Sequence, residues 1–240
     1  MEGHNVDLWK RSEPTFQTDF LVREKIPTWL GDVRNKKILD AGCGEGYVAR
    51  KLAKLEAKIK AIDSDPKMIS LAKSCEENSG IEYKIGNVLE LEKFYKKEEF
   101  DIVLFSGVPP FFDEHQLLKL CKNGFYVLRK GGTILLTTNH TRSYFEKAKS
   151  RWLEFLTEPN TKLGSQKFNL NFYTPDKQKA FSGEAWIHTP EQIKKILTES
   201  GFQISHVYQP LAKEEMKHHP EMWGDEDKIP YHLAVVGVKL

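Results

Sequence analysis

Short apolar runs alternate with segments of helical spacing from residue 37 to residue 138. Met68, Leu71, Ala72 and Cys75 recur at i, i+3, i+4 and i+7, which predicts one buried face of a helix. The continuous apolar runs predict five strands, at 38–41, 58–62, 81–85, 100–105 and 133–138. Strands that alternate with helices indicate βαβ units, and right-handed crossovers then favour a doubly wound, mostly parallel α/β sheet.

Regular patterning also marks the C-terminal part of the chain. Thr189, followed three residues later by Gln192, has the form of a capping box, with Pro190 at the first helical position. We expect a helix there and then strands at 202–208 and 231–238. Two strands joined without a helix can be antiparallel neighbours, so they would complete a seven-stranded sheet as a hairpin.

Two segments depart from this pattern. Residues 139–187 hold nine aromatic residues in 49, whereas aromatics make up 11% of the chain. We interpret them as an insertion, part helix and part loop, whose aromatics either form a small core of their own or line an apolar substrate pocket. Residues 1–36 are either an amphipathic helix lying on the core or a lid over a ligand. The predicted organisation is a lid segment at 1–36, a cofactor-binding core at 37–138, a cap at 139–187 and completing elements at 188–240.

Composition narrows the classes of function. Lys and Arg number 36 against 34 Asp and Glu, and a formal charge of +2 argues against a dedicated nucleic-acid binder. No stretch reaches the roughly 18 apolar residues of a membrane span, and the first residues show no secretory signal. Three cysteines cannot all pair within one chain, which favours a reducing compartment. We therefore expect a cytoplasmic monomer or homodimer without nucleic-acid or membrane partners.

The clearest chemical signal follows the first predicted strand. The run Asp40-Ala41-Gly42-Cys43-Gly44-Glu45-Gly46 joins that strand to a helix. Glycines let a ligand approach the backbone closely, and a helix start presents free N–H groups. A dinucleotide site would show G-x-G-x-x-G, but the third glycine here comes one residue too early, so a nicotinamide oxidoreductase is less favoured. The other alternative is a tight strand-to-helix turn without a ligand.

Two further strand ends carry polar side chains. Asp63 ends the second strand, where its carboxylate could accept both hydroxyls of a ribose. The alternative role is helix capping, for which Asp65 is better placed. Asn87 follows the third strand, where it could bond the exocyclic amine of an adenine while the N–H of Val88 reaches a ring nitrogen. The alternative for Asn87 is a plain turn residue.

Together these strand ends resemble the class I S-adenosylmethionine-dependent methyltransferases, in particular their small-molecule, type 11-like branch. The resemblance covers most of the chain and implies a Rossmann-like methyltransferase fold. It also implies S-adenosylmethionine as cofactor and S-adenosylhomocysteine as product. The corresponding motifs are the glycine-rich motif at 38–53, the ribose motif at 61–73, the adenine motif at 85–91 and a fourth motif at 100–112.

The resemblance implies a set of cofactor-binding residues. Gly42 and Gly44 would pass beside the methionine part, Asp63 would hold the ribose, and Ser64 or Met68 would flank the adenine. The backbone after the fourth strand would close the methionine end. The implied set is Asp40, Gly42, Cys43, Gly44, Asp63, Ser64, Met68, Asn87, Val88, Phe105 and Ser106.

The fourth motif departs from the family pattern. Many relatives carry V-L-H-H-F there, but this chain has Val108-Pro109-Pro110-Phe111-Phe112, so no histidine can be carried over. The same run resembles the N-P-P-Y signature of enzymes that methylate amide or nucleobase nitrogens. In that signature the first residue accepts a hydrogen bond from the target amine, which Val108 cannot do. Methylation of nucleic acid or protein amides is therefore less favoured.

Two histidines are candidate catalytic bases. His140 lies just past the fifth strand and His188 just before the capped helix, and for each the alternative is a structural histidine bonded to the backbone. His218 and His219 lack a third ligand at metal spacing, so no metal site is expected. The sequence predicts in-line methyl transfer to a nitrogen or oxygen of a small, fairly apolar molecule. The rival hypothesis is a non-catalytic partner protein that binds S-adenosylmethionine.

Overall fold

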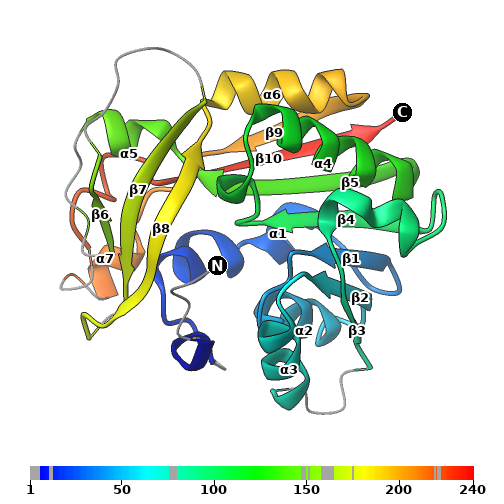
Figure 1. Cartoon of the computed structure of the whole chain (residues 1–240), viewed down its shortest axis with the longest axis horizontal. Coiled ribbons are helices and arrows are strands. Elements are labelled where there is room, and N and C mark those ends of the chain that lie inside the picture. Colours follow the sequence, from blue (N-terminus) through cyan, green and yellow to red (C-terminus); the bar gives the residue numbers. More distant parts are fainter. Residues whose placement is uncertain are drawn as a thin grey trace.

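A seven-stranded sheet, in the order β3-β2-β1-β4-β5-β10-β9, forms the centre of the molecule (Figure 1). The computed structural model describes residues 6–10, 13–75, 80–146, 150, 152–157, 165–174, 176–218, 220 and 223–240. The strands are β1 (Lys37–Ala41), β2 (Lys58–Asp63), β3 (Glu82–Ile85), β4 (Phe100–Ser106), β5 (Leu128–Asn139), β9 (Phe202–Tyr208) and β10 (His232–Lys239). Neighbours pair in parallel except β10, which is antiparallel to both β5 and β9. The predicted fold class is confirmed.

Helices cover both faces of this sheet because its strands are apolar on both sides. In β1, Ile38 faces one core cluster and Leu39 the other, and both side chains are fully buried. Burial of each such side chain contributes about 1.5–3 kcal/mol. One face carries α4 (Glu114–Val127) and α6 (Pro190–Glu199); the other carries α1 (Ile26–Leu30), α2 (Tyr47–Ala53) and α3 (Pro66–Ser74).

The helix starts predicted from the sequence are confirmed. The Thr189 hydroxyl accepts from the Gln192 N–H at 3.2 Å, and the Gln192 side chain accepts from the Thr189 N–H at 2.9 Å. Asp65 caps α3 by accepting from the Lys67 N–H at 2.8 Å. These side chains supply acceptors for N–H groups that have no partner within a first helical turn.

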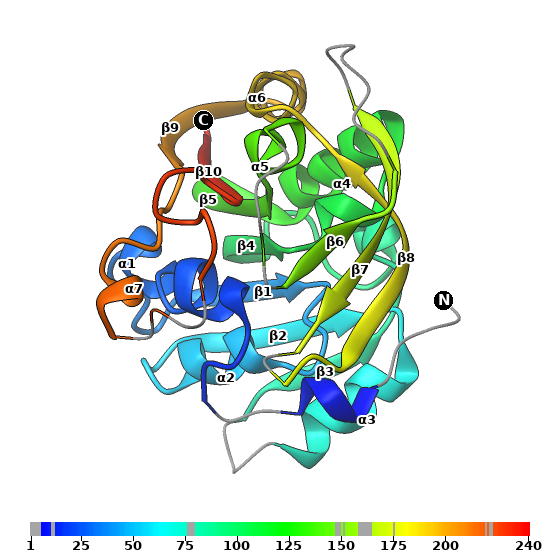
Figure 2. The same ribbon diagram turned by 90° about the vertical axis from the view of Figure 1, so that its left-hand side faces the viewer.

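The described part of the 139–187 insertion is mostly a three-stranded antiparallel sheet, in the order β6-β7-β8. It comprises the short helix α5 (Thr141–Phe145) followed by β6 (Leu153–Phe155), β7 (Gln166–Tyr173) and β8 (Lys179–Ile187). The expectation of helix and loop is wrong because Phe168, Leu170 and Phe172 alternate along β7 and pack into one cluster, the period of a half-buried strand. This cap sheet stands beside the ends of the central strands (Figure 2).

The N-terminal segment joins the cap to the core and is not one amphipathic helix. Its elements are the short helices η1 (Val6–Trp9) and η2 (Asp19–Arg23), followed by α1. The buried ring of Phe16 lies 5.2 Å, centroid to centroid, from Phe172 of the cap. Trp29 stacks at 4.9 Å on Tyr208 of the main sheet.

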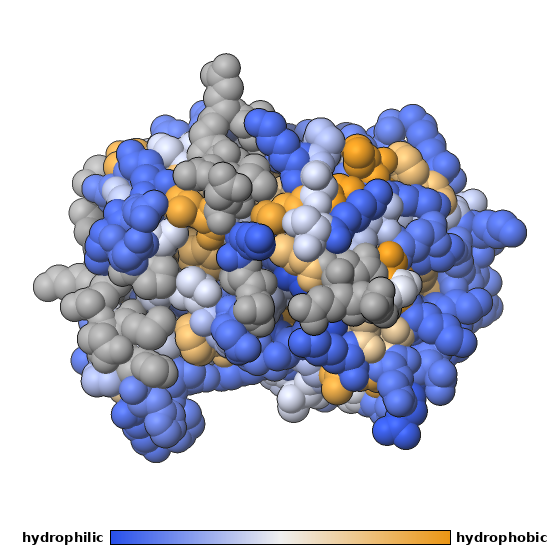
Figure 3. Space-filling model, turned by 90° about the horizontal axis from the view of Figure 1, so that it is seen from below, coloured by the Kyte–Doolittle hydropathy of each residue, from blue (hydrophilic) through white to orange (hydrophobic). Residues whose placement is uncertain are grey.

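The surface shows scattered apolar groups. On the face in Figure 3, hydrophobic residues lie in separate patches among hydrophilic ones. Single exposed apolar residues of this kind are normal for a folded protein. Within the described ranges, no helix combines the length and the apolar character that a membrane crossing needs.

Candidate functional site

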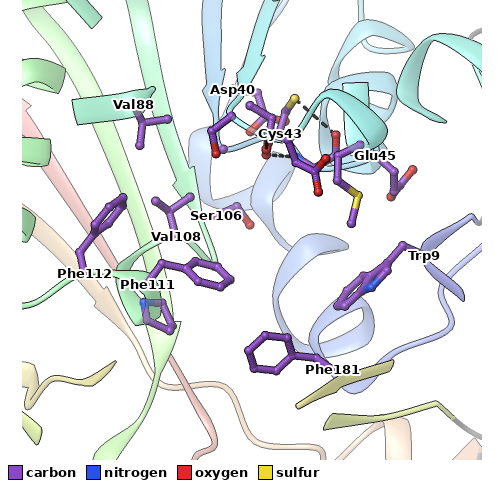
Figure 4. A pocket seen from close by; sticks show the side chains of 18 of the residues that line it. Trp9, Asp40, Cys43, Glu45, Val88, Ser106, Val108, Phe111, Phe112 and Phe181 are labelled. Carbon is purple, nitrogen blue, oxygen red and sulfur yellow. Dashed lines mark hydrogen bonds between the residues drawn. The ribbon is translucent and has the colours of Figure 1, made fainter. Parts of the chain in front are cut away.

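A cavity of about 920 Å³ lies between the ends of the central strands and the cap sheet (Figure 4). It lies at the ends of β1 and β4, the two neighbouring strands between which the strand order reverses. Ligands of α/β folds bind at such topological switch points. The cavity brings together most of the cofactor-binding residues predicted from the sequence. Those that line it are Asp40, Gly42, Cys43, Gly44, Asp63, Ser64, Met68, Asn87, Val88 and Ser106.

Phe105 is the member of the predicted set that the cavity lining does not include. Its side chain is fully buried in the core against Gly124 of α4, on the face of β4 that carries Val103. Successive residues of a strand point to opposite faces, and along β4 the cavity lining begins at Ser106.

The glycine-rich turn has a conformation and a packing that require glycine. Gly42 has φ +80°, and a Cβ built there would lie 2.4 Å from Cγ2 of Val108. Gly46, the residue before α2, has φ +78°, and its Cβ would lie 2.5 Å from the Tyr83 hydroxyl. The turn therefore exposes bare backbone to the cavity while it packs tightly behind.

Asp63 both builds this turn and faces the cavity. One carboxylate oxygen accepts from the Gly44 N–H at 2.8 Å, and the other accepts from the Asp65 N–H at 2.9 Å. Burial raises the pKa of Asp63, and the two backbone N–H groups oppose that rise. Each oxygen retains a second lone pair, so the carboxylate can still accept from a ligand.

Asn87 likewise has two roles, one in the local fold and one at the cavity. Its side-chain oxygen accepts from the Leu89 N–H at 2.9 Å and so caps the short helix η3 (Val88–Lys93). The capping role corresponds to the turn alternative, yet Asn87 and Val88 also line the cavity. The cap holds the Asn87 side chain at the wall next to the first N–H of η3.

Asp40 is a buried acid at the end of β1. It is 1% exposed, and none of the described residues forms a hydrogen bond with its Oδ2 atom. The pKa of Asp40 is raised to about 7, mainly by burial and then by the charges of Asp63 and Glu45, while Arg23 opposes the rise. Burial also holds the pKa of the neighbouring Cys43 thiol well above its ordinary value, which keeps that thiol protonated.

Arg23, which sequence reasoning missed, reaches the cavity from η2. Its Nη1 donates to Oδ1 of Asp19 at 2.7 Å, and that Asp19 side chain is fully buried. The only local signal is an i, i+4 acid–base pair, which is common on solvated helix faces.

The two histidines predicted as bases do not line the cavity. His140 caps α5, accepting from the Arg142 N–H at 3.0 Å, and its other ring nitrogen lies 3.2 Å from the Gln209 oxygen. His188 lies between the Ser165 hydroxyl at 2.8 Å and the Phe112 carbonyl at 3.0 Å. Both are buried, and burial lowers the pKa of each. Their placement corresponds to the structural alternative, in which all ring nitrogens already have partners.

The wall opposite the strand ends is rich in aromatic side chains. Trp9, Phe111 and Phe181 lie across the cavity from Asp40 and Cys43 (Figure 4). The N-terminal segment, the loop after β4 and the cap each contribute one of these rings. Phe181 and Trp186 belong to the insertion whose aromatics were expected either to form a core or to line a pocket, and Trp9 belongs to the segment considered as a lid. Lining residues that the sequence did not single out include Phe111, Gln116, Lys167 and Ser182.

Charged groups on the cap wall are paired. Lys167 of β7 forms an ion pair with Glu184 of β8, and both side chains are about half exposed. Among the described residues, no group of three His, Cys, Asp or Glu could hold a metal ion. His218 is the last residue of α7 (Glu215–His218), and His219 lies outside the described residues.

Comparisons with known proteins bear on this site. Residues 32–234 match the model of a protein family described as "Methyltransferase domain". The "Ubiquinone biosynthesis O-methyltransferase" of Xanthomonas campestris pv. campestris (strain B100) is 30% identical over 119 residues, which cover 47% of this chain and 47% of that protein. The chain thus spans about half the length of the curated relatives it matches.

Solved structures share the fold. An S-adenosylmethionine-dependent methyltransferase from Listeria monocytogenes, described as putative, superposes with a TM-score of 0.69 at 20% identity, over 90% of this chain and 96% of the other. A 1,6-didemethyltoxoflavin-N1-methyltransferase from Burkholderia thailandensis, solved with its substrate and S-adenosylhomocysteine, gives a TM-score of 0.58 at 14% identity, over 90% and 76% of the two chains.

Proposed function

Because the chain belongs to the methyltransferase-domain family, whose model it matches over residues 32–234, we propose that it methylates a nitrogen or oxygen atom of a small, largely apolar molecule, with S-adenosylmethionine as the methyl donor. The observation that carries this proposal is a single cavity with two unlike walls. Strand ends with glycine, carboxylate and amide groups form one wall, and aromatic side chains form the other.

The residues of the first wall fit the cofactor. The turn leaves open space for a ligand beside the bare backbone of Gly44, where a Cβ would meet nothing within 4 Å, and the Asp63 carboxylate retains lone pairs for ribose hydroxyls. Asn87 and Val88 lie at the start of η3, where backbone N–H groups lack helical partners and can donate to a ring nitrogen. The buried Asp40 oxygen without a partner calls for a donor from a ligand.

The chain's own part in the reaction is alignment and exclusion of water. When bound, the cofactor would supply a methyl group on a positively charged sulfur: the acceptor's lone pair would bond to the methyl carbon while the carbon–sulfur bond breaks and its electron pair stays on sulfur. The aromatic wall orients a flat acceptor and keeps water from the reacting atoms. A neutral amine needs no base from the protein, and it loses its extra proton to solvent after transfer.

A hydroxyl acceptor makes a further demand, because it must lose a proton as it reacts. On the cap wall Glu184 is the carboxylate that lines the cavity, and it forms an ion pair with Lys167. Glu184 is therefore the residue we assign as proton acceptor if the acceptor atom is oxygen.

The size and lining of the cavity support a small acceptor. About 920 Å³ lies within the range of ordinary small-molecule sites and must hold both cofactor and acceptor. The names of the relatives support both kinds of acceptor atom, since the curated relative is an O-methyltransferase and the Burkholderia structure an N1-methyltransferase.

Calorimetric titration followed by a methyl-transfer screen tests the proposal. We expect S-adenosylhomocysteine to bind the whole chain with one site, and labelled methyl from S-adenosylmethionine to reach a catechol, an aromatic amine or a nitrogen heterocycle. Failure of well-folded protein to bind S-adenosylhomocysteine would refute the proposal. Binding without transfer to any of these three classes would favour the rival function, a partner protein that binds the cofactor without catalysis.

A further inference from the structure

The buried side chain of His188 connects the base of the cap sheet to the loop after β4. His188 directly follows β8, and Ser165 directly precedes β7. The two strands pair there, with Gln166 opposite Ile187. Nδ1 of His188 lies 2.8 Å from the Ser165 hydroxyl, and Nε2 lies 3.0 Å from the carbonyl oxygen of Phe112. One fully buried ring therefore fastens the base of the β7–β8 hairpin to that loop.

The direction of each of these bonds follows from its neighbours. The Thr189 N–H donates to Oε1 of Gln192 at 2.9 Å, so the other amide atom, Nε2, is the one that lies 2.9 Å from the Ser165 hydroxyl. An amide NH2 only donates, so the Ser165 oxygen accepts it and turns its own hydrogen toward Nδ1 of His188. A carbonyl oxygen only accepts, so Phe112 requires the ring proton on Nε2. The chain of bonds thus specifies one neutral tautomer.

The surroundings of His188 keep this ring neutral. Burial is the largest influence and lowers its pKa, while the carbonyls of Phe112 and Pro109 and the charges of Glu114 and Asp113 oppose the fall. Both acidic residues lie at the start of α4. Protonation would place a second N–H on Nδ1, against the hydroxyl hydrogen that points at it.

The loop that His188 holds carries part of the aromatic wall. Its centre is the short helix η4 (Pro109–Phe111). The Phe112 N–H donates to the Pro109 carbonyl at 3.1 Å, so Phe112 is fixed through its N–H on one side and by His188 through its carbonyl on the other. Phe111 lines the cavity, and its ring is half-exposed (Figure 4). A half-exposed ring has few packing contacts of its own, so the backbone of the loop decides its position.

We propose that His188 is a positioning residue for the methyl acceptor, because its Nε2–H bond sets the loop that carries Phe111 against the cap strand that carries Phe181. These two rings come from different segments and belong to the same aromatic wall. His188 lies outside the cavity lining, so it acts through that wall and not as a base. The inference rests on the proposed function, in which the wall orients a flat acceptor.

Two variants of His188 separate its two bonds. Glutamine can keep an NH2 at the place of Nε2, whereas asparagine is one bond shorter and reaches only toward Ser165. We expect the Phe111 and Phe112 amides to exchange hydrogen at least about 5-fold faster in His188→Asn than in the wild type, and within about 2-fold of it in His188→Gln. In the wild type, nitrogen NMR of labelled histidine should show His188 protonated on Nε2 alone near neutral pH.

Kinetics with catechol, aniline and benzimidazole as acceptors test the effect on methyl transfer. For each of these probes that is methylated, KM should rise at least about 10-fold in His188→Asn and stay within about 3-fold in His188→Gln, since a buried carbonyl loses its donor in the first variant alone. The affinity for S-adenosylhomocysteine should stay within about 2-fold of the wild type in both, because the lost bond lies on the acceptor side.

The pH profile gives a readout that a merely structural residue would not change. As pH falls below 6.5, kcat/KM of the wild type should fall relative to that of His188→Gln, because only the wild type has a ring to protonate at this position. Titration of the acceptor cancels in this ratio. His140→Asn is the matched control, since His140 is also buried and asparagine keeps the cap of α5. It should leave the profile of the wild type unchanged.

The outcomes separate this inference from the proposed function. If S-adenosylhomocysteine does not bind, or binds without transfer to any acceptor, the proposed function fails and the inference fails with it. If transfer occurs but the asparagine and glutamine variants have the same KM, the inference alone is overturned. Equal losses of cofactor affinity and acceptor KM would make His188 a general structural residue. A proton on Nδ1 in the wild type would also overturn it, and that measurement does not depend on whether a variant folds.

Discussion

Replacement of Gly42 by alanine tests the close packing of the glycine turn. A Cβ at Gly42 would lie 2.4 Å from Cγ2 of Val108, in a backbone with φ +80°. Gly44 also has positive φ, +54°, but a Cβ there would meet nothing within 4 Å. Gly44→Ala is thus a matched control that has the backbone strain without the clash.

The expected magnitudes follow from these two terms. A left-handed backbone costs a residue other than glycine about 1–2 kcal/mol, and overpacking a tight site costs about 1–3 kcal/mol more. We therefore expect Gly42→Ala to lower the free energy of unfolding by about 2–5 kcal/mol, and Gly44→Ala by about 1–2 kcal/mol. Val108 is 5% exposed, and Val108→Ala removes the clashing methyl group at a cost of about 2 kcal/mol of its own.

Urea unfolding, followed by circular dichroism, measures these differences. In the double variant, the loss of the Val108 methyl relieves the clash, so the combined cost should fall short of the sum of the single costs by about 1–3 kcal/mol. Costs that add to within about 0.5 kcal/mol would refute the packing argument, since independent sites behave in that way. A Gly44→Ala cost equal to that of Gly42→Ala would refute it as well.

Three further predictions concern the cavity. Asp63→Asn places an amide NH2 against one of the N–H groups of Gly44 and Asp65, so it should lower the free energy of unfolding by about 1–3 kcal/mol. Calorimetry should show at least about a 10-fold loss of affinity for S-adenosylhomocysteine. Asp65→Asn is the control, because asparagine can keep the helix cap and the change should cost little. Phe181→Ala should lower kcat/KM for the acceptor about 10-fold or more, with the affinity for S-adenosylhomocysteine unchanged; a loss of cofactor affinity instead would place Phe181 on the wrong wall. The pKa of Asp40 is raised from 3.8 to about 7 in the folded chain, mainly by burial, so the folded chain keeps a proton that the unfolded chain has lost. This group therefore lowers the stability as pH rises from about 4 to about 7. Thermal melts of Asp40→Asn should lack that part of the decline. Parallel pH profiles for wild type and Asp40→Asn would contradict the assignment.

The main sheet could be predicted because its information is local. Its central parallel strands are buried on both faces, so they read as continuous apolar runs, and the helices between them show a 3.6-residue period. The capping box at Thr189 and the cap at Asp65 are likewise local patterns. The cap sheet was not predicted, because the apolar alternation of Phe168, Leu170 and Phe172 is short and polar residues interrupt its strands.

The sequence by itself determined the alternation of strands and helices in the core, the glycine turn and the position of Asp63 at a strand end. Each of these features depends on residues that are neighbours in the chain. Only the tertiary structure decided which polar groups share the cavity. Arg23 and Asp40 both line it, whereas His140 and His188 form hydrogen bonds outside it. The physical reason is that burial and charge depend on segments that are distant along the chain. A histidine or an arginine has the same local pattern whether its partner is a backbone group, a buried carboxylate or a ligand.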